Sequence, residues 1–140
     1  MYLLDTNVIS ELRKASSGKA DANVINWARD KATSSLFISS VTIMEIEMGI
    51  LQLERKDLQQ ASIYRTWLND HVLKAFSDRI LSFDTSAALK CAQLHIPDPK
   101  SERDAMIAAT AMVHNFRLVT RNLKDFKHID VKLVNPWGVC

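Results

Sequence analysis

Apolar positions along the chain fall into two alternating patterns. Short apolar runs that end in polar residues predict strands, at residues 2–4, 36–38, 79–83 and 117–120, with a weaker one at 131–134. Between them, apolar residues recur with the period of a helix, at residues 7–14, 22–32, 41–53, 57–74, 85–95 and 101–115. Strands that alternate with helices are typical of βαβ units. The pattern therefore predicts an α/β fold, with a mostly parallel sheet of four to five strands flanked by helices.

The segments that interrupt these patterns are short. Residues 14–21 predict a polar, flexible surface loop, and residues 97–101 predict a second loop that opens a helix. Neither is long enough to separate domains, and a length of 140 residues favours one domain over residues 1–140. The chain has only three glycines and three prolines, too few for the many turns of a β-sandwich. The small residues at 108–111 suit close packing of their helix on the sheet.

Several large apolar side chains lie on the predicted helices. We expect core or interface positions for them and expect the last tryptophan to pack the C-terminus against the protein. They are Trp27, Met44, Met48, Trp67 and Phe76, followed by Trp137.

Composition and charge narrow the class of protein. The chain is 47% apolar and 24% charged, which are ordinary globular values. With 18 basic and 16 acidic residues the net charge is +2, so any nucleic-acid binding requires a local patch. Cys91 and Cys140 are interpreted as free thiols in a reducing compartment. The apolar opening is too short for a signal peptide, and no run is long enough to cross a bilayer, so we expect a cytoplasmic protein with no membrane contact.

Polar side chains gather where the predicted strands end. Asp5 follows the first strand directly, and Thr120 and Asn122 follow the fourth. Glu45 and Asp104 each lie one turn into a helix. Ligands of parallel α/β sheets bind at the carboxyl ends of the strands, so these residues are candidates for one site.

Helix capping offers a structural explanation for each acid taken alone. Glu45 closes a T-x-x-E capping box with Thr42, and Asp104 closes an S-x-x-D box with Ser101. Asp5 itself has the position of an N-cap. Asp84 also follows a strand and precedes a helix, and we interpret it as a plain N-cap.

The three acids together favour a metal site. Carboxylates from separate segments that meet at one sheet edge repel each other unless a cation neutralises them. Oxygen-only ligands point to Mg²⁺ or Mn²⁺, and the four histidines show no zinc-binding spacing. The sequence has no glycine-rich phosphate loop, no G-x-S-x-G motif and no paired cysteine and histidine nucleophile.

Four segments, in order, resemble the motifs of PIN-domain nucleases, especially the VapC and FitB-like toxins of type II toxin–antitoxin systems. The resemblance spans the chain, and the ending NPW also suits the FitB-like branch. The segments are LDTNVIS at 4–10, VTIMEIEMGI at 41–50, DAMIAATA at 104–111 and VTRNLKDF at 119–126. The resemblance implies the three-layer PIN-like α/β fold.

The same resemblance implies roles for individual residues. Asp5, Glu45 and Asp104 would hold Mg²⁺, with Mn²⁺ as a substitute. Many relatives carry a further acid where this chain has Asn122, and Asp125, one turn later, is the candidate for the missing carboxylate. The remaining implied roles are catalytic positioning by Thr120, substrate binding by Arg121 and Arg103, and support by Asn7 and Thr6.

By resemblance, the protein is a Mg²⁺-dependent endoribonuclease toxin that cleaves a structured RNA such as tRNA and inhibits translation and growth. A VapB-like antitoxin would neutralise it by covering a groove formed by helices 41–53 and 57–74. A homodimer and a toxin–antitoxin hetero-oligomer are also implied, with DNA contacted only through the antitoxin.

Three alternatives remain at this stage. The first is a binding module, a PIN domain that keeps the fold but has lost catalytic activity, and the amide at Asn122 favours it. A phosphatase of the haloacid dehalogenase type also places an aspartate after its first strand, but its chemistry needs a second aspartate where this chain has Asn7. A DNase or 5′ nuclease uses similar acids but usually needs additional helical regions.

Overall fold

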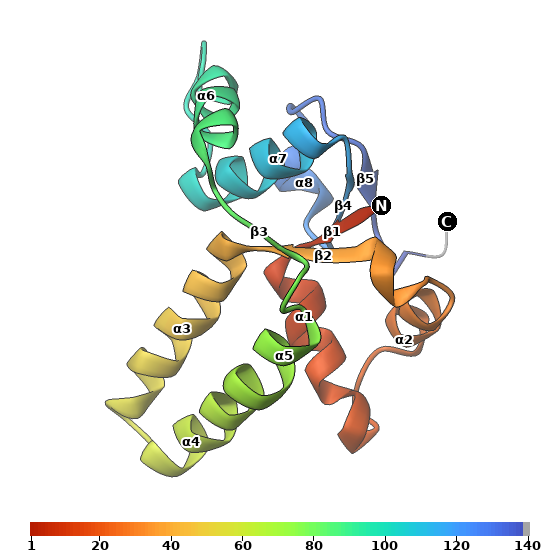
Figure 1. The fold of residues 1–140 in the computed structure, drawn as a ribbon, viewed down its shortest axis with the longest axis vertical. Helices are drawn as coiled ribbons and strands as arrows, with labels where there is room; N and C mark the ends of the chain where they lie inside the picture. The colour runs from red at the N-terminus through yellow and green to blue at the C-terminus, as the bar shows by residue number, and fades with distance from the viewer. Residues whose placement is uncertain (139–140) are drawn as a thin grey trace.

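The computed structural model describes residues 1–138, and its centre is a five-stranded parallel sheet (Figure 1). The strand order is β3-β2-β1-β4-β5, and all four strand pairs are parallel. In the register, Leu3 pairs with both Phe37 and Leu118. The strands are β1 (Tyr2–Leu4), β2 (Leu36–Ser39), β3 (Ile80–Leu81), β4 (Arg117–Val119) and β5 (Leu133–Val134). All five predicted strands are present, which confirms the α/β fold.

Helices cover both faces of this sheet, so the fold has three layers. In Figure 1, α6, α7 and α8 lie above the sheet, and α1 to α5 lie below it. The helices on one face are α1 (Thr6–Arg13), α2 (Ala22–Arg29), α3 (Ser40–Glu54), α4 (Leu58–Trp67) and α5 (Leu73–Ala75). Those on the other face are α6 (Thr85–Leu94), α7 (Glu102–His114) and α8 (Leu123–Phe126).

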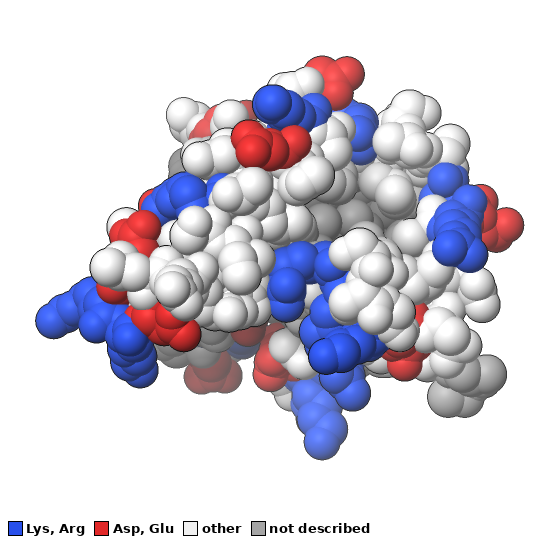
Figure 2. Space-filling view, turned by 90° about the horizontal axis from the view of Figure 1, so that it is seen from below, with Lys and Arg blue, Asp and Glu red and all other residues white. Residues whose placement is uncertain are grey.

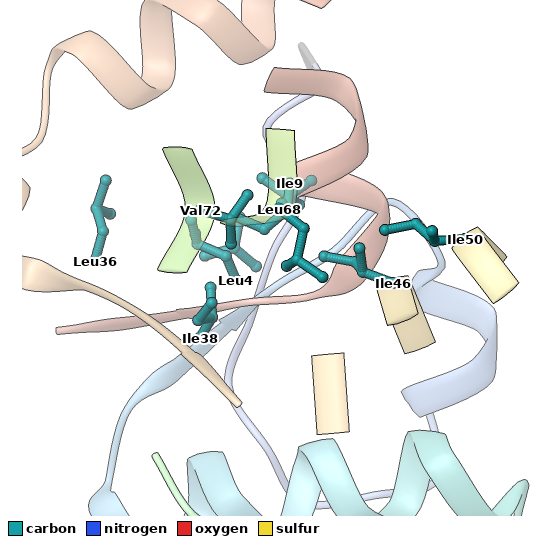
Figure 3. Packing of buried hydrophobic residues seen from close by; sticks show 10 residues of the cluster. Leu4, Ile9, Leu36, Ile38, Ile46, Ile50, Leu68 and Val72 are labelled. Atoms are coloured by element: carbon teal, nitrogen blue, oxygen red, sulfur yellow. The ribbon is translucent and has the colours of Figure 1, made fainter. Parts of the chain in front are cut away.

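Successive residues of β1 build the cores on the two faces. Leu4 packs with Ile9, Ile46 and Leu68 of the lower helices (Figure 3), whereas Leu3 packs with residues of α7 and α8. Leu3 and Leu4 are both fully buried. Side chains alternate between the faces of a strand, so a strand that is apolar at every position is buried on both sides.

The small-residue stretch of α7 behaves as predicted. Ala108 and Ala111 pack against the sheet with Leu118, while Ala105 and Ala109 contact Cys91 of α6. Alanine side chains let the helix approach both neighbours closely. Cys91 is a buried free thiol, and Cys140 lies outside the described residues.

Other predictions need correction. The predicted helix 57–74 is interrupted, because residues 68–72 form a π-helical turn between α4 and α5. A single π-helical turn leaves no clear break in the apolar pattern, because Leu68 and Val72 are both buried. The predicted strand 79–83 pairs only at Ile80 and Leu81, on the sheet edge. Part of the predicted loop 14–21 is the 3-10 helix Lys14–Ser17, which ends at Gly18 with a positive φ of 74°.

The large apolar side chains divide into two groups. The tryptophans and Phe76 pack against the lower core, as expected. Met44 and Met48 are 43% and 39% exposed, so a core position is wrong for them. They lie one turn apart on the outer face of α3. None of the helices in the described part of the chain combines the length and hydropathy needed to cross a membrane.

Candidate functional site

Asp5 is held at the carboxyl edge of the sheet, where β1 ends and α1 begins. Its carboxylate is almost fully buried and accepts three hydrogen bonds. Thr120 Oγ1 donates to Asp5 Oδ2 over 2.8 Å, and Asn7 Nδ2 donates to the same oxygen over 3.4 Å. The backbone N–H of Thr6 donates to Oδ1 over 2.8 Å. The bonds to Asp5 therefore come from the start of α1 and from the end of the neighbouring strand β4, which fixes the side chain in place.

Asn7 and Thr120 join the ends of β1 and β4 into one network. Asn7 Nδ2 donates to Thr120 Oγ1 over 3.2 Å, and the Arg121 N–H donates to Asn7 Oδ1 over 3.3 Å. The Asn122 N–H donates to Thr120 Oγ1 over 3.1 Å. The fourth sequence motif is thus attached to the first through a fully buried hydroxyl. Asn7 therefore holds the backbone of the fourth motif in place.

Glu45 reaches the same edge from the second turn of α3. Thr6 Oγ1 donates to Glu45 Oε1 over 2.6 Å and lies 3.1 Å from the hydroxyl oxygen of Thr42. Arg103 Nε lies 3.7 Å from the other oxygen, Oε2. Thr6 therefore orients Glu45 relative to Asp5, and the Arg103 guanidinium lies at the outer side of the cluster.

The acids influence each other's charge. Burial raises the pKa of Asp5 to about 6, and the charges of Asp104 and Glu45 add to this effect, against the hydrogen bonds from Thr120 and Thr6. Burial also raises the pKa of Asp104, as do the charges of Asp125 and Glu45. These four carboxylates therefore share one electrostatic environment, which brings together the acids of all four motifs.

The donor set fits a hard divalent cation. It consists of carboxylate oxygens, and the pKa values of Asp5 and Asp104 are raised, so these two groups gain most from a neighbouring positive charge. Oxygen ligands suit Mg²⁺ and Mn²⁺. Within residues 1–138, no three Asp, Glu, His or Cys side chains converge closely enough to hold an ion as they stand. The carboxylates would have to move closer together around a bound ion.

Several polar side chains of the fourth motif are more exposed than those of Asp5 and Glu45. Asn122 and Asp125 are both exposed, and Asn122 is the N-cap residue of α8 without a side-chain capping bond. Arg121 is exposed as well, and its guanidinium lies 5.3 Å from the ring centre of Trp137. The Arg121 backbone is thus bonded to Asn7 at the edge where Asp5 lies, while its side chain contacts Trp137.

Capping does not explain Glu45. Helix α3 begins at Ser40, and its cap is Ser39, whose hydroxyl accepts from the Val41 N–H over 3.0 Å. The predicted capping box of Thr42 and Glu45 is therefore wrong, since both residues lie inside the helix. Ser101 is the N-cap residue of α7, but its side chain makes no capping bond to the helix backbone.

Asp84 is an N-cap, as predicted, because it accepts from the Ala87 N–H over 3.0 Å. We expect Asp84→Ala to lower the free energy of unfolding by about 1 kcal/mol, the usual loss for an N-cap. Urea unfolding measures this loss. RNA cleavage at a temperature where the variant is folded should equal that of the unmodified protein. Reduced cleavage by the folded variant would show that Asp84 also serves the site.

A groove adjoins the acidic cluster, where α3 and α4 meet as predicted, and α1 also contributes to its wall. It has a volume of about 490 Å³ and lies between α1, α3 and α4. Its lining includes Thr6 and Glu45 of the cluster, together with Arg13, Lys56 and Tyr64. These last three residues lie on separate segments, and no sequence motif connects them.

The chain is similar to known proteins in sequence. The sequence model of the family described as PIN domain matches residues 2–132. The VapC ribonuclease Y4jK of Sinorhizobium fredii is 33% identical, with 98% of each chain covered. Toxin FitB of Neisseria gonorrhoeae is 30% identical, over 98% of this chain and 99% of the relative.

Solved structures agree in fold. FitAcB from Neisseria gonorrhoeae superposes with a TM-score of 0.87 at 30% identity, covering 99% of this chain and 100% of that chain. FitAB bound to an IR36 DNA fragment superposes with a TM-score of 0.85 at 29% identity, covering 99% and 97%.

Proposed function

The chain belongs to the PIN-domain family, and from this premise we propose that it is a metal-dependent endoribonuclease that acts as the toxin of a toxin–antitoxin pair. In this proposal residues 1–140 form one catalytic domain. The observation that carries the proposal is the buried Asp5 carboxylate, whose pKa is raised to about 6 beside two further acids. Strongly perturbed pKa values of buried groups cluster at functional sites, so this carboxylate marks the sheet edge as the candidate active site.

Asp5, Glu45 and Asp104 would hold Mg²⁺, or Mn²⁺ in its place, and Asp125 is the candidate for an additional ligand. When bound, the ion would polarise the scissile phosphate and lower the pKa of a water molecule. Thr120 and Asn7 keep Asp5 in position through their hydrogen bonds. The hydrogen bond from Thr6 keeps Glu45 directed at the same place.

In the proposed reaction, Glu45 orients the attacking water and accepts its proton. The water oxygen bonds to phosphorus while the bond from phosphorus to the 3′ oxygen breaks, and the 3′ oxygen takes up a proton. No covalent intermediate with the protein is required. Asn122 and Thr120 position the fourth motif beside the phosphate.

Arg121 and Arg103 are the proposed contacts to the RNA backbone. Both are exposed, Arg103 lies 3.7 Å from Glu45, and the Arg121 backbone is bonded to Asn7. A guanidinium can bind a phosphate with two hydrogen bonds. Specific RNA recognition usually targets loops with unstacked bases. A structured RNA such as tRNA is therefore the proposed substrate, and inhibition of translation the proposed consequence.

The proposed partners are a VapB-like antitoxin and a second copy of the chain, in a cytoplasmic complex that contacts DNA through the antitoxin. The relative FitB is named a toxin, and FitAB is described bound to DNA, which supports this assembly. The α3–α4 pair, proposed for the antitoxin, exposes Met44, Met48, Leu51 and Leu58. Exposed apolar side chains of this size are common at protein interfaces.

Cleavage of a labelled total tRNA pool tests the proposal. We expect discrete fragments with Mg²⁺ and none when EDTA removes the ion. The protein must be folded and free of co-purified inhibitor. Fragments that persist in EDTA would contradict the metal dependence. An intact pool, with other RNAs and DNA also uncut, would favour a PIN domain that only binds.

A further inference from the structure

The groove beside the acidic cluster has cations at its far end. Thr6 begins α1 and Arg13 ends it, while Glu45 lies near the start of α3 and Lys56 lies just after its end. The groove therefore runs along both helices, away from the sheet edge. Figure 2 shows this end of the molecule, with Lys and Arg side chains on both sides of a mostly uncharged surface.

We propose that this groove binds a single-stranded segment of the RNA substrate, with its phosphates on Arg13, Lys14 and Lys56. The identity of the strand as substrate rests on the proposed ribonuclease function. The groove volume of about 490 Å³ falls within the range of about 300–1,000 Å³ that is usual for ligand sites.

Charge favours a polyanion at the far end. The lining contains the three cations named above and one carboxylate, Glu45, at the other end. Lys14 pairs with Glu11 over 3.2 Å, whereas Arg13 and Lys56 form no ion pair with any carboxylate of residues 1–138. Their charge therefore remains available for backbone phosphates.

The groove also offers flat groups on which bases stack. Tyr64 and Trp67 are half-buried in its wall, with their rings edge to face and their centres 6.4 Å apart. The Arg13 guanidinium lies 4.4 Å from the centre of the Tyr64 ring. Unpaired RNA bases stack on aromatic rings and on arginine planes, so these groups suit a strand whose bases are exposed.

Gly49 keeps the wall of the groove open. It lies in the interior of α3 and lines the groove, where glycine weakens a helix relative to alanine. A Cβ added at Gly49 would meet nothing within 4 Å, so packing of the protein does not require glycine there. The missing side chain leaves room for close approach of a bound molecule.

The test measures binding of a labelled, unstructured 12-nucleotide RNA by fluorescence anisotropy. The full-length protein carries Asp5→Asn so that cleavage does not interfere. On this background we expect Arg13→Gln with Lys56→Gln to weaken binding about tenfold at low salt. The slope of log affinity against log salt should fall by about 1.4, or about 0.7 for each lost phosphate contact. The matched control is Arg29→Gln, an exposed cation on α2, and should change the affinity less than about twofold.

Gly49→Ala provides a second variant whose folding is assured. We expect a higher melting temperature together with weaker RNA binding, a combination that a purely structural glycine would not give. If Gly49→Ala and the double variant both bind RNA like the background protein, the groove proposal is overturned. It is also overturned if they lose antitoxin binding while RNA binding is unchanged.

The two proposals fail separately. Suppose that the protein with Asp5 intact cleaves RNA but the groove variants bind RNA without change. This result would support the ribonuclease function and contradict the groove proposal. Suppose instead that RNA binding depends on the groove but no RNA is cleaved. This result would contradict the ribonuclease function and support the groove as an RNA-binding site.

Discussion

Asp5→Asn is expected to lower RNA cleavage at least ~10²-fold, on the scale of electrostatic contributions removed from active sites. The change removes one negative charge from the cluster that would hold the cation, yet keeps the size and shape of the side chain. Initial rates on a labelled RNA under saturating Mg²⁺ measure the effect. Asp84→Asn is the matched control, because Asp84 also follows a strand and caps a helix but lies outside the cluster.

The same substitution should stabilise the metal-free protein at neutral pH. The pKa of Asp5 is about 6 in the folded protein, above the ordinary value of 3.8. A raised folded-state pKa contributes stability that is fully present below pH 4 and is lost as the pH rises through 6. The unmodified protein should lose about 2–3 kcal/mol of unfolding free energy over this window relative to the variant.

Urea unfolding in EDTA at pH 4 and pH 8 measures this difference. Comparing Asp5→Asn with the unmodified protein at each pH isolates Asp5 from the other titrating groups. Added Mg²⁺ should restore stability to the unmodified protein at pH 8 and have little effect on the variant. A variant that is equally destabilised at both pH values would indicate that Asp5 is a structural hydrogen-bonding residue, and the metal-site proposal would fail.

The strands and most helices could be predicted because each carries its own apolar pattern. Leu3 and Leu4 are consecutive apolar residues, a pattern that by itself indicates a strand buried on both faces, and both side chains are fully buried. The short helix α8 has only four residues, too few for an apolar period to develop. Sequence periodicity therefore could not predict this helix.

The residues of the site could be predicted more readily than their hydrogen bonds and capping roles. The T-x-x-E pattern of Thr42 and Glu45 looks like a capping box, but Ser39 is the true cap of α3. A threonine three residues before a glutamate gives this pattern in two cases, when the threonine caps a helix and when both residues lie inside the helix. The hydrogen bond from Thr6 to Glu45 joins residues far apart in the sequence, so no local pattern reveals it.

Phe126→Ala is expected to cost about 3–5 kcal/mol of unfolding free energy, the usual loss for a buried phenylalanine. Phe126 is fully buried in the core above the sheet, with Leu3 and Leu118. It is the one buried residue of α8, and the neighbouring Asn122 makes no side-chain capping bond. This single side chain therefore anchors the segment that carries Asp125.

Urea unfolding of Phe126→Ala, compared with Leu123→Ala on the same helix, tests this anchor. Leu123 is 38% exposed, so its truncation should cost less than about 1 kcal/mol. Cleavage at low temperature, where both variants are folded, should fall further for Phe126→Ala, because Asp125 loses its place near Asp104. Equal losses of stability in the two variants would show that α8 is held by other contacts. Unchanged cleavage by folded Phe126→Ala would show that the fourth motif need not be fixed for the reaction.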